Sequence, residues 1–394
     1  MTFRIDRRQL AIWLALGAAP RARAQSGGFG AFLETLWPRA KAAGVSRATF
    51  DGAVAGLAPD AALIARGDAQ PEFERPISAY VADATSSGRV ATGIAMRTRW
   101  AQELAAIVRA QGVPAEIVLA LWGMETGFGR ASAGDHDVVR SLATLAYGRH
   151  DEAMADEVVA AMVMLERHLA TRDNLKGSWA GAMGQPQFLP SAYLRYAVPY
   201  GRGGEANIWN SVPDALASIA HFMREQGWKP GLAWGSETIV PQGFDWRDLT
   251  GTFSAFAAKG FVRANGDALL PGGAATLYLP AGASGPAFLL SDNYWTIKQY
   301  NNSDSYALSV ALMGERIAGR AGVKAAWPAT KPLPAADRVK MQNLLHAKGF
   351  YDGKIDGKFG PLGREAVHRF QLSAGISPAD GFASGKVLEA LRGR

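Results

Sequence analysis

The chain contains no cysteine among its 394 residues. This absence excludes disulfide bonds, thiol catalysis, thiolate-bound metals and lipid attachment through an N-terminal cysteine, so the protein is not expected to be a lipoprotein. Histidine is also scarce, with six in the whole chain, and these do not cluster at the spacing of metal ligands. We therefore expect neither a metal nor a cofactor.

The chain also lacks an uninterrupted apolar run of about 20 residues, so we expect no stable membrane insertion. A shorter apolar run at residues 10–19 follows three arginines and precedes a small-x-small site at Ala22–Ala24. This pattern is typical of a secretory signal peptide over residues 1–24. A buried N-terminal helix is the alternative, and the export route, general secretion or twin-arginine, stays open.

The long middle segment of the chain, residues 25–334, has no strong excess of positive or negative charge. The net charge is +7, but residues 1–24 and residues 335–394 each carry about +4, which leaves the long middle segment close to neutral. Nucleic-acid-binding proteins usually concentrate positive charge in their main body, so we expect no nucleic-acid partner. A weakly basic C-terminal segment suits an anionic polymer such as a cell wall.

An apolar stretch from Val113 to Arg130 predicts a buried helix that begins at Pro114 and ends at Gly127 and Gly129. Glu125 falls in its last turn. The negative end of the helix dipole and an apolar environment both disfavour the charged carboxylate, so we expect the pKa of Glu125 to be raised. A protonated glutamate near neutral pH can act as a general acid. The alternative is a solvent-facing residue at a frayed helix end.

The remaining segments predict a mainly α protein. Helices are expected at residues 151–169 and 211–227, and an irregular, glycine- and proline-rich loop at 178–193. Short β-branched runs between 236 and 290 indicate a small β-rich insert, followed by an aromatic, asparagine-rich loop and a helix up to 318. A segment with three prolines, 324–336, indicates a stiff linker. Three short helices are expected beyond it.

Four motifs then carry a family resemblance: Leu121–Gly129, Gly181–Ser191, Ile208–Ala215 and Lys298–Asn302. Together they resemble the lytic murein transglycosylase B family, over residues 30 to 320. The resemblance implies a lysozyme-like helical catalytic domain with a small β-rich insert. Residues 349–371 resemble a three-helix peptidoglycan-binding domain. The domains expected are thus a signal peptide at 1–24, a catalytic domain at 25–323, the linker at 324–336 and a peptidoglycan-binding domain at 337–394.

The resemblance also implies a reaction: cleavage of the bond between N-acetylmuramic acid and N-acetylglucosamine without water, which leaves a 1,6-anhydromuramoyl end. Glu125 matches the single catalytic carboxylate of the family. The positions that match substrate contacts are Ser178, Gln187, Tyr300, Asn301 and, on weaker local motifs, Tyr80 and Arg149. Each has a structural alternative: Ser178 and Gln187 as partners of loop backbone, Tyr300 as a core aromatic, and Arg149 as a surface ion-pair partner.

The resemblance implies one function, to which two alternatives remain open. The protein is expected to be a lytic transglycosylase of cell-wall remodelling or turnover, with a hydrolytic muramidase or an inactive wall-binding scaffold as alternatives. Its expected partner is the glycan strand of peptidoglycan, its expected location is the periplasm, and it is expected to be a monomer.

One departure from the family concerns metal binding. Many members carry an acidic, calcium-binding loop between the second and third motifs, whereas residues 198–207 here retain only Glu205 and Asn207 as side-chain oxygen ligands, with Arg202 among them. We therefore expect no calcium in this loop. In the C-terminal segment, Asp352 and Asp356 are expected to form turns, and His346 and His368 to lie on the surface.

Overall fold

The structure is a computed structural model that describes residues 28–68, 75–131, 134–201, 203–329 and 332–393. The predicted signal peptide, 1–24, lies outside these residues. The chain divides into two compact units by its internal contacts. Of the described residues, we call 28–68 with 91–225 the helical unit, and 75–90 with 226–393 the sheet unit. The fold is mainly α, as predicted.

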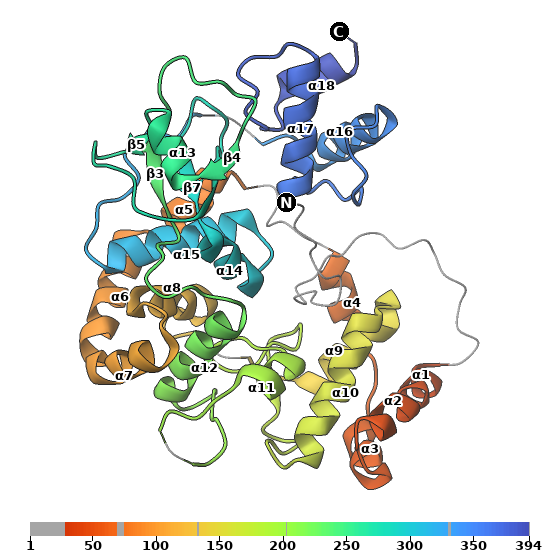
Figure 1. The fold of residues 1–394 in the computed structure, drawn as a ribbon. Helices are drawn as coiled ribbons and strands as arrows, with labels where there is room; N and C mark the ends of the chain where they lie inside the picture. The colour runs from red at the N-terminus through yellow and green to blue at the C-terminus, as the bar shows by residue number, and fades with distance from the viewer. Residues whose placement is uncertain (1–27, 69–74, 132–133, 202, 330–331, 394) are drawn as a thin grey trace. The chain divides into compact units, whose positions relative to one another are not determined.

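The helical unit is built on a pair of packed helices, α9 (Val138–Arg149) and α10 (Glu152–Glu166), which lie beside each other in Figure 1. Other helices of the unit are α1 (Phe29–Thr35), α2 (Trp37–Ala42), α3 (Arg47–Val54), α4 (Ala61–Asp68), α7 (Ala101–Gln111), α11 (Pro190–Tyr196) and α12 (Val212–Glu225). A further helix, α6 (Ser87–Arg99), begins in the sheet unit's residues, and β1 (His136–Asp137) pairs with β2 (Lys176–Gly177). The helix predicted over 151–169 is too long at its C-terminal end, because α10 ends at Glu166 and His168 adopts a left-handed conformation, φ 58°.

The predicted helix with Glu125 is α8 (Ala115–Thr126). It follows Pro114 and is capped by Gly127 in the left-handed conformation, φ 58°, as the sequence pattern indicated. Every residue from Ile117 to Gly123 is buried, so α8 runs through the core rather than along its edge. Among the described residues, no single helix is long and apolar enough to cross a membrane; α7 and α8 pass that test only as a pair bent by 110°.

The predicted β-rich insert is a five-stranded antiparallel sheet in the sheet unit, with strand order β4-β6-β7-β3-β5. Its strands are β3 (Gly235–Ile239), β4 (Thr250–Thr252), β5 (Val262–Arg263), β6 (Ala274–Tyr278) and β7 (Ala287–Leu290). Leu289 is central, paired with Ser236 on one side and with Leu277 on the other. A short helix, α13 (Phe253–Ala258), packs its phenylalanines into the same apolar cluster as Leu277 and Leu289.

The predicted aromatic loop after the insert is wrong, because Asp292–Tyr300 forms a helix, α14. Ser291 caps it by accepting a hydrogen bond from the backbone N–H of Asn293 (3.1 Å). The buried amide of Asn293 accepts from the N–H of Lys229 and donates to the carbonyls of Lys229 and Leu232. The asparagine thus fastens the preceding loop to the helix start. Helices α14 and α5 (Ile77–Ala84) both pack against α15 (Asp304–Ile317).

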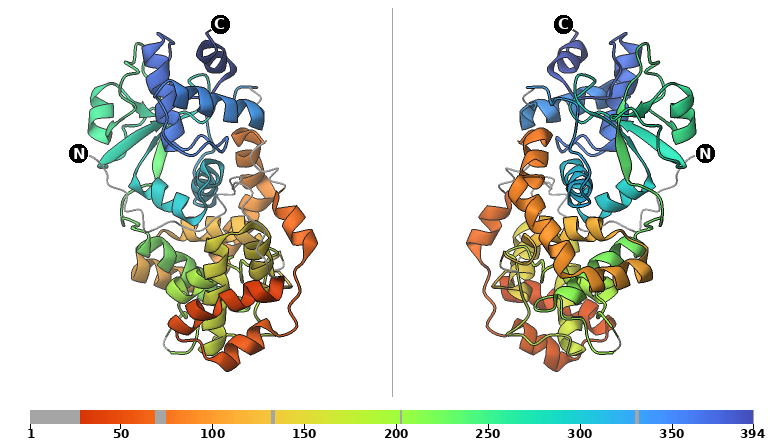
Figure 2. Two further views of the ribbon diagram at one scale, coloured as in Figure 1. Left: turned by 90° about the vertical axis from the view of Figure 1, so that its right-hand side faces the viewer. Right: turned by 90° about the vertical axis from the view of Figure 1, so that its left-hand side faces the viewer.

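The C-terminal segment forms the three expected helices, α16 (Ala335–Ala347), α17 (Pro361–Ser373) and α18 (Gly385–Leu391), which lie together in both views of Figure 2. We call residues 335–391 the C-terminal module. Its core centres on Met341, Leu345 and Val367. The Asp352–Asp356 region is a turn, held by the buried amide of Gln342, which accepts from the N–H groups of Asp356 and Gly357.

The expectation for the two C-terminal histidines holds for one of them. His346 is exposed, as predicted. His368 is half-buried, and its Nε2 lies 2.6 Å from the carbonyl oxygen of Trp246 in the β-rich insert. The predicted surface position of His368 is therefore wrong, because this side chain on α17 contacts Trp246, which lies 122 residues earlier in the chain.

Candidate active site

Glu125 is the penultimate residue of α8 and is half-buried, whereas residues 117–123 before it are all buried. The indole of Trp122, one turn earlier, packs edge-on against Phe128 at 5.6 Å between ring centres. Gly127 then turns the chain away from the helix axis. The carboxylate is thus carried on a rigid element and placed where the core opens. This geometry suits a group that must meet a substrate in a fixed orientation.

The residue that ties α8 to the second motif is Gln185, which the sequence analysis did not single out. Its buried Oε1 accepts a hydrogen bond from Nε1–H of Trp122 (2.9 Å), and its carbonyl accepts from the hydroxyl of Thr126 (3.2 Å). Its backbone N–H donates to the carbonyl of Ile208 in the third motif (2.9 Å). One glutamine therefore joins three of the four motifs. Gln185 stands in the motif Gly181–Ser191, two residues before Gln187, but its partners in the first and third motifs cannot be read from the sequence.

Ser178 and Gln187 lie at the two ends of a single tight loop. The hydroxyl of Ser178 accepts from the N–H of Ala182 (3.1 Å), while its backbone N–H donates to the carbonyl of Ala182 (2.7 Å). The side-chain amide of Gln187 donates to the carbonyl of Gly184 (2.9 Å), and Gln187 itself adopts a left-handed conformation, φ 55°. Both residues are half-buried. Their hydrogen bonds to the backbone fix the loop. Their contacts with substrate remain predictions.

Gly184 allows this loop to approach the third motif closely. Its φ is +63°, and a methyl group at its Cα would lie 2.8 Å from the carbonyl oxygen of Ile208 and 2.6 Å from its side chain. Only glycine meets both conditions without strain. The next residue of the third motif, Trp209, donates from its indole to the carbonyl of Lys176 (3.0 Å). The second and third motifs are therefore one packed structure around the end of α8.

A second glutamate of the helical unit, Glu157 on α10, is completely buried. Its carboxylate accepts hydrogen bonds from the hydroxyl (2.5 Å) and the backbone N–H (2.9 Å) of Ser191, in the first turn of α11. Burial raises the pKa of Glu157, and the two hydrogen bonds from Ser191 oppose this rise. Because both its oxygens are engaged, Glu157 anchors the end of the second motif and does not face a substrate.

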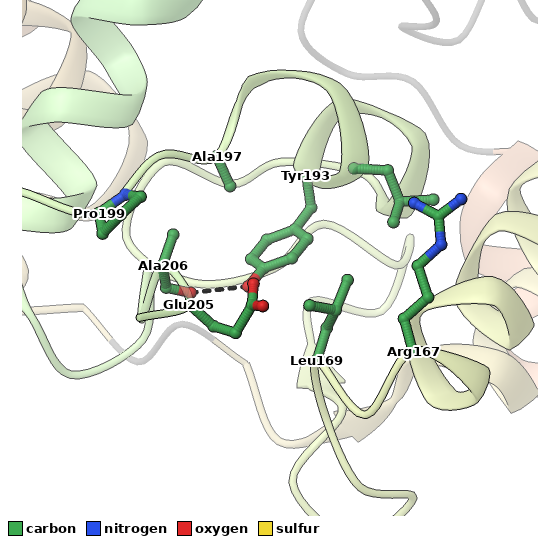
Figure 3. A pocket seen from close by; sticks show the side chains of 8 residues that line it. Arg167, Leu169, Tyr193, Ala197, Pro199, Glu205 and Ala206 are labelled. Atoms are coloured by element: carbon green, nitrogen blue, oxygen red, sulfur yellow. Dashed lines mark hydrogen bonds between the residues drawn. The ribbon is translucent and has the colours of Figure 1, made fainter. Parts of the chain in front are cut away.

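The loop at 198–207, in which the sequence predicts no calcium, is closed by hydrogen bonds. The two carboxylate oxygens of Asp214 accept from the N–H groups of Tyr200 (2.9 Å) and Asn207 (2.8 Å). An open cavity of about 280 Å³ is lined by residues that include Tyr193, Glu205 and Ala206. At this cavity the hydroxyl of Tyr193 donates to the carbonyl of Ala206 at 2.7 Å (Figure 3). Burial, with the charges of Glu205 and Asp214, raises the pKa of Tyr193 to about 12. Among the described residues, no three or more His, Asp or Glu side chains gather as metal ligands.

The other predicted site residues are divided between the units. Arg149 is half-buried at the last turn of α9 in the helical unit. Tyr80 is half-buried on α5 in the sheet unit. Tyr300 ends α14, is buried, and stacks nearly parallel on Tyr306 of α15 with ring centres 6.5 Å apart. Asn301 follows as the extended residue that ends α14. Their contacts with a substrate remain predictions.

The helical architecture, with one glutamate at the end of a buried helix and a small antiparallel insert, places the protein in the lysozyme-like class of folds. A family model described as "Transglycosylase SLT domain" matches residues 28–315, and a second model, for a peptidoglycan-binding domain, matches residues 334–391. The chain therefore belongs to the SLT-domain transglycosylase family, which confirms the predicted resemblance.

Three known proteins illustrate this relationship. "Membrane-bound lytic murein transglycosylase B" of Escherichia coli (strain K12) is 32% identical over 240 residues, 58% of this chain, and the chain covers 64% of that relative's length. The crystal structure of SltB3 from Pseudomonas aeruginosa in complex with NAG-anhNAM-pentapeptide is 38% identical, with a TM-score of 0.84 over 92% of this chain and 99% of that one. The Escherichia coli lytic transglycosylase Slt35 in complex with calcium is 26% identical, with a TM-score of 0.60 over 74% of this chain and 92% of that one.

Proposed function

We propose that this protein is a peptidoglycan lytic transglycosylase that acts in cell-wall remodelling or turnover. Its substrate is the glycan strand, and its product carries a 1,6-anhydromuramoyl end. The observation that carries this proposal is the position of Glu125 at the open end of a buried helix, fastened through Gln185 to two further motifs. The bound NAG-anhNAM-pentapeptide in the related SltB3 structure supports the same product chemistry.

In the proposed mechanism, Glu125 acts first as an acid and then as a base. Its proton passes to the glycosidic oxygen as the bond from that oxygen to C1 of the muramoyl sugar breaks. The 2-acetamido group of the sugar stabilises the cationic carbon. The C6 hydroxyl then bonds to C1, and its proton passes to the carboxylate of Glu125, which ends the cycle protonated. No water is consumed, and the C1–O6 bond closes the anhydro ring.

This sequence of steps requires one carboxylate, whereas most glycosidases use two. Glu157 is unsuited to the second role because both its oxygens bind Ser191 inside the core. We propose that Ser178 and Asn301 hold the acetamido group and that Gln187 orients the sugar. Tyr80, Arg149 and Tyr300 are proposed as further substrate contacts.

The molecular context forms part of the proposal. We propose a signal peptide at 1–24, a catalytic domain at 25–323, a linker at 324–336 and a peptidoglycan-binding domain at 337–394. The mature protein would act in the periplasm as a monomer, without lipid attachment or a nucleic-acid partner. The match of residues 334–391 to a peptidoglycan-binding domain supports the wall-binding role of the C-terminal module.

The test is product analysis with Glu125→Gln. We expect the wild-type protein to release anhydro-muropeptides from purified peptidoglycan, and Glu125→Gln to lose this activity by about 10²–10⁴-fold, the usual contribution of a general acid–base residue. Glu116→Gln, in the first turn of the same helix, is the matched control and should retain activity.

Mass spectrometry of the released fragments separates the alternatives. Products heavier by one water would identify a muramidase. Binding of the wall without any release by the wild-type protein would identify an inactive scaffold.

A further inference from the structure

Asp304, at the start of α15, carries a largely buried carboxylate that is held by two cations. Its side chain is 15% exposed; Oδ1 lies 2.7 Å from Nζ of Lys298, and Oδ2 lies 2.6 Å from a guanidinium nitrogen of Arg364. Lys298 belongs to α14, but Arg364 belongs to α17 of the C-terminal module. One of the two cations therefore comes from a part of the chain 60 residues away.

Arg364 is itself enclosed in the sheet unit. Its side chain is 21% exposed, and its guanidinium lies over the ring of the buried Tyr278 of β6, 4.7 Å from the ring centre. Burial alone would raise the pKa of Asp304, but the charges of Arg364 and Lys298 outweigh it and hold this pKa below its ordinary value. The carboxylate therefore stays ionised, and its ion pair with Arg364 is maintained.

This ion network adjoins the late motif, Lys298–Asn302. Lys298 supplies one cation and stands two residues before Tyr300. On the other side, the carbonyl of Asn301 accepts from the N–H of Ser303 (2.6 Å), the residue that caps α15 directly before Asp304. The network thus fixes the end of α14 against the start of α15, and Tyr300 and Asn301 lie in the segment between.

Three further contacts hold the module and the preceding segment to the β-rich insert. His368 reaches the carbonyl of Trp246 at 2.6 Å, and a carboxylate oxygen of Asp380 accepts from the N–H of Ala283 (3.0 Å). Before the module, the carboxylate of Glu237 on β3 accepts from the N–H groups of Lys324 and Ala325, both at 2.8 Å. The module is thus held to the insert through His368 and Asp380, and the chain that precedes the module is held to the insert through Glu237.

From these contacts we infer that the C-terminal module is a structural part of the catalytic machinery, and that Arg364 is a positioning residue for the Lys298–Asn301 segment. This inference rests on the proposed function, because it assigns Arg364 an effect on the reaction through Tyr300 and Asn301. A tethered wall anchor would only raise the local concentration of substrate. An integral module also sets the geometry of the site.

The test compares Arg364→Gln with Arg369→Gln in the full chain. Both residues lie on α17, but Arg369 is exposed and donates to the carbonyl of Phe350 within the module. On a soluble glycan strand, Arg364→Gln should lower kcat/KM by about 10- to 100-fold, the effect expected of a small misplacement near the reaction centre. Arg369→Gln should match the wild type. Pelleting with insoluble peptidoglycan should be unchanged in both.

Two further variants distinguish positioning from general loss of structure. Arg364→Lys keeps a cation near Asp304 and should recover part of the activity. In a protein that already carries Asn301→Ala, Arg364→Gln should lower kcat/KM much less than it does in the wild type. The reason is that the segment through which Arg364 acts has already lost the proposed contact of Asn301 with substrate. Full additivity of the two substitutions, or wild-type kcat/KM in Arg364→Gln, would overturn the inference.

The inference and the proposed function fail in different ways. If Glu125→Gln abolishes product release while Arg364→Gln is fully active, the proposed function stands and the positioning role is wrong. If the wild-type protein releases no anhydro-muropeptide, the proposed function is wrong, and the positioning role falls with it.

Discussion

Glu125 and Glu157 show how surroundings assign different tasks to the same side chain. Glu125 stands half-buried at the end of α8, next to a loop whose backbone is fixed through Gln185. Glu157 is fully buried and gives both oxygens to Ser191. The first is the residue that we propose exchanges protons with the substrate. The second stabilises the start of α11 and thereby the end of the loop that carries Gln187.

The raised pKa of Glu157 predicts a pH dependence of stability. Below the ordinary glutamate pKa, about 4.3, the residue is protonated in both the folded and the unfolded chain. Above it, the unfolded chain releases the proton first, so the contribution of Glu157 to stability falls as the pH rises through its raised folded-state pKa. The unfolding free energy of the wild type, minus that of Glu157→Gln, should therefore decrease from pH 4.5 to pH 8, by about 1.4 kcal/mol per unit of pKa shift.

Urea unfolding of both proteins at the two pH values measures this difference. Glu152→Gln, an exposed position at the start of the same helix, provides the control and should change little with pH. A wild-type-to-Glu157→Gln difference that is constant with pH would contradict the prediction.

At the scale of elements, local sequence patterns were sufficient to predict a helix and its bounds wherever capping residues and apolar spacing agreed. The bounds of α8 could be predicted because Pro114 and Gly127 mark its ends and most residues between them are apolar. The helix α14 was mistaken for a loop because its aromatic and asparagine-rich composition is typical of loops. The hydrogen bonds from the amide of Asn293 to two distant carbonyls, which fix the start of the helix, cannot be seen in a local pattern. Gln185 was missed for the same reason. Its importance lies in its partners, Trp122 and Ile208, which no local pattern reveals.

The closed loop at 198–207 predicts that calcium has no effect on stability. Both oxygens of Asp214 are used by backbone N–H groups of Tyr200 and Asn207, so binding a cation would first require these hydrogen bonds to break. Thermal unfolding should give the same Tm in millimolar calcium chloride and in EDTA. Since a ligand that binds only the folded state raises Tm, a calcium-dependent increase would show that the loop still binds the ion.

At the scale of the whole chain, the sequence indicated the C-terminal module but not its attachment. The three helices and their core are local features, and each could be predicted. The ion pair between Arg364 and Asp304 and the contact of His368 with Trp246 join residues 60 and 122 positions apart. Periodicity and composition carry no information on such pairs. A proline-rich segment before the module suggested a spacer, whereas its first residues bind Glu237.

This attachment predicts that truncation before Lys324 changes the role of Asp304. In the full chain, Asp304→Asn leaves the buried Lys298 and the partly exposed Arg364 without their carboxylate and should lower the unfolding free energy by about 3 kcal/mol. In the truncated chain, Arg364 is absent and water reaches the carboxylate, so Asp304→Asn should lower the unfolding free energy by clearly less. Thermal and urea unfolding of the full and truncated chains, each with and without Asp304→Asn, measure both decreases. An equal cost in both backgrounds would mean that the module and the late motif are energetically independent, whereas the predicted difference would measure the coupling that the ion pair provides.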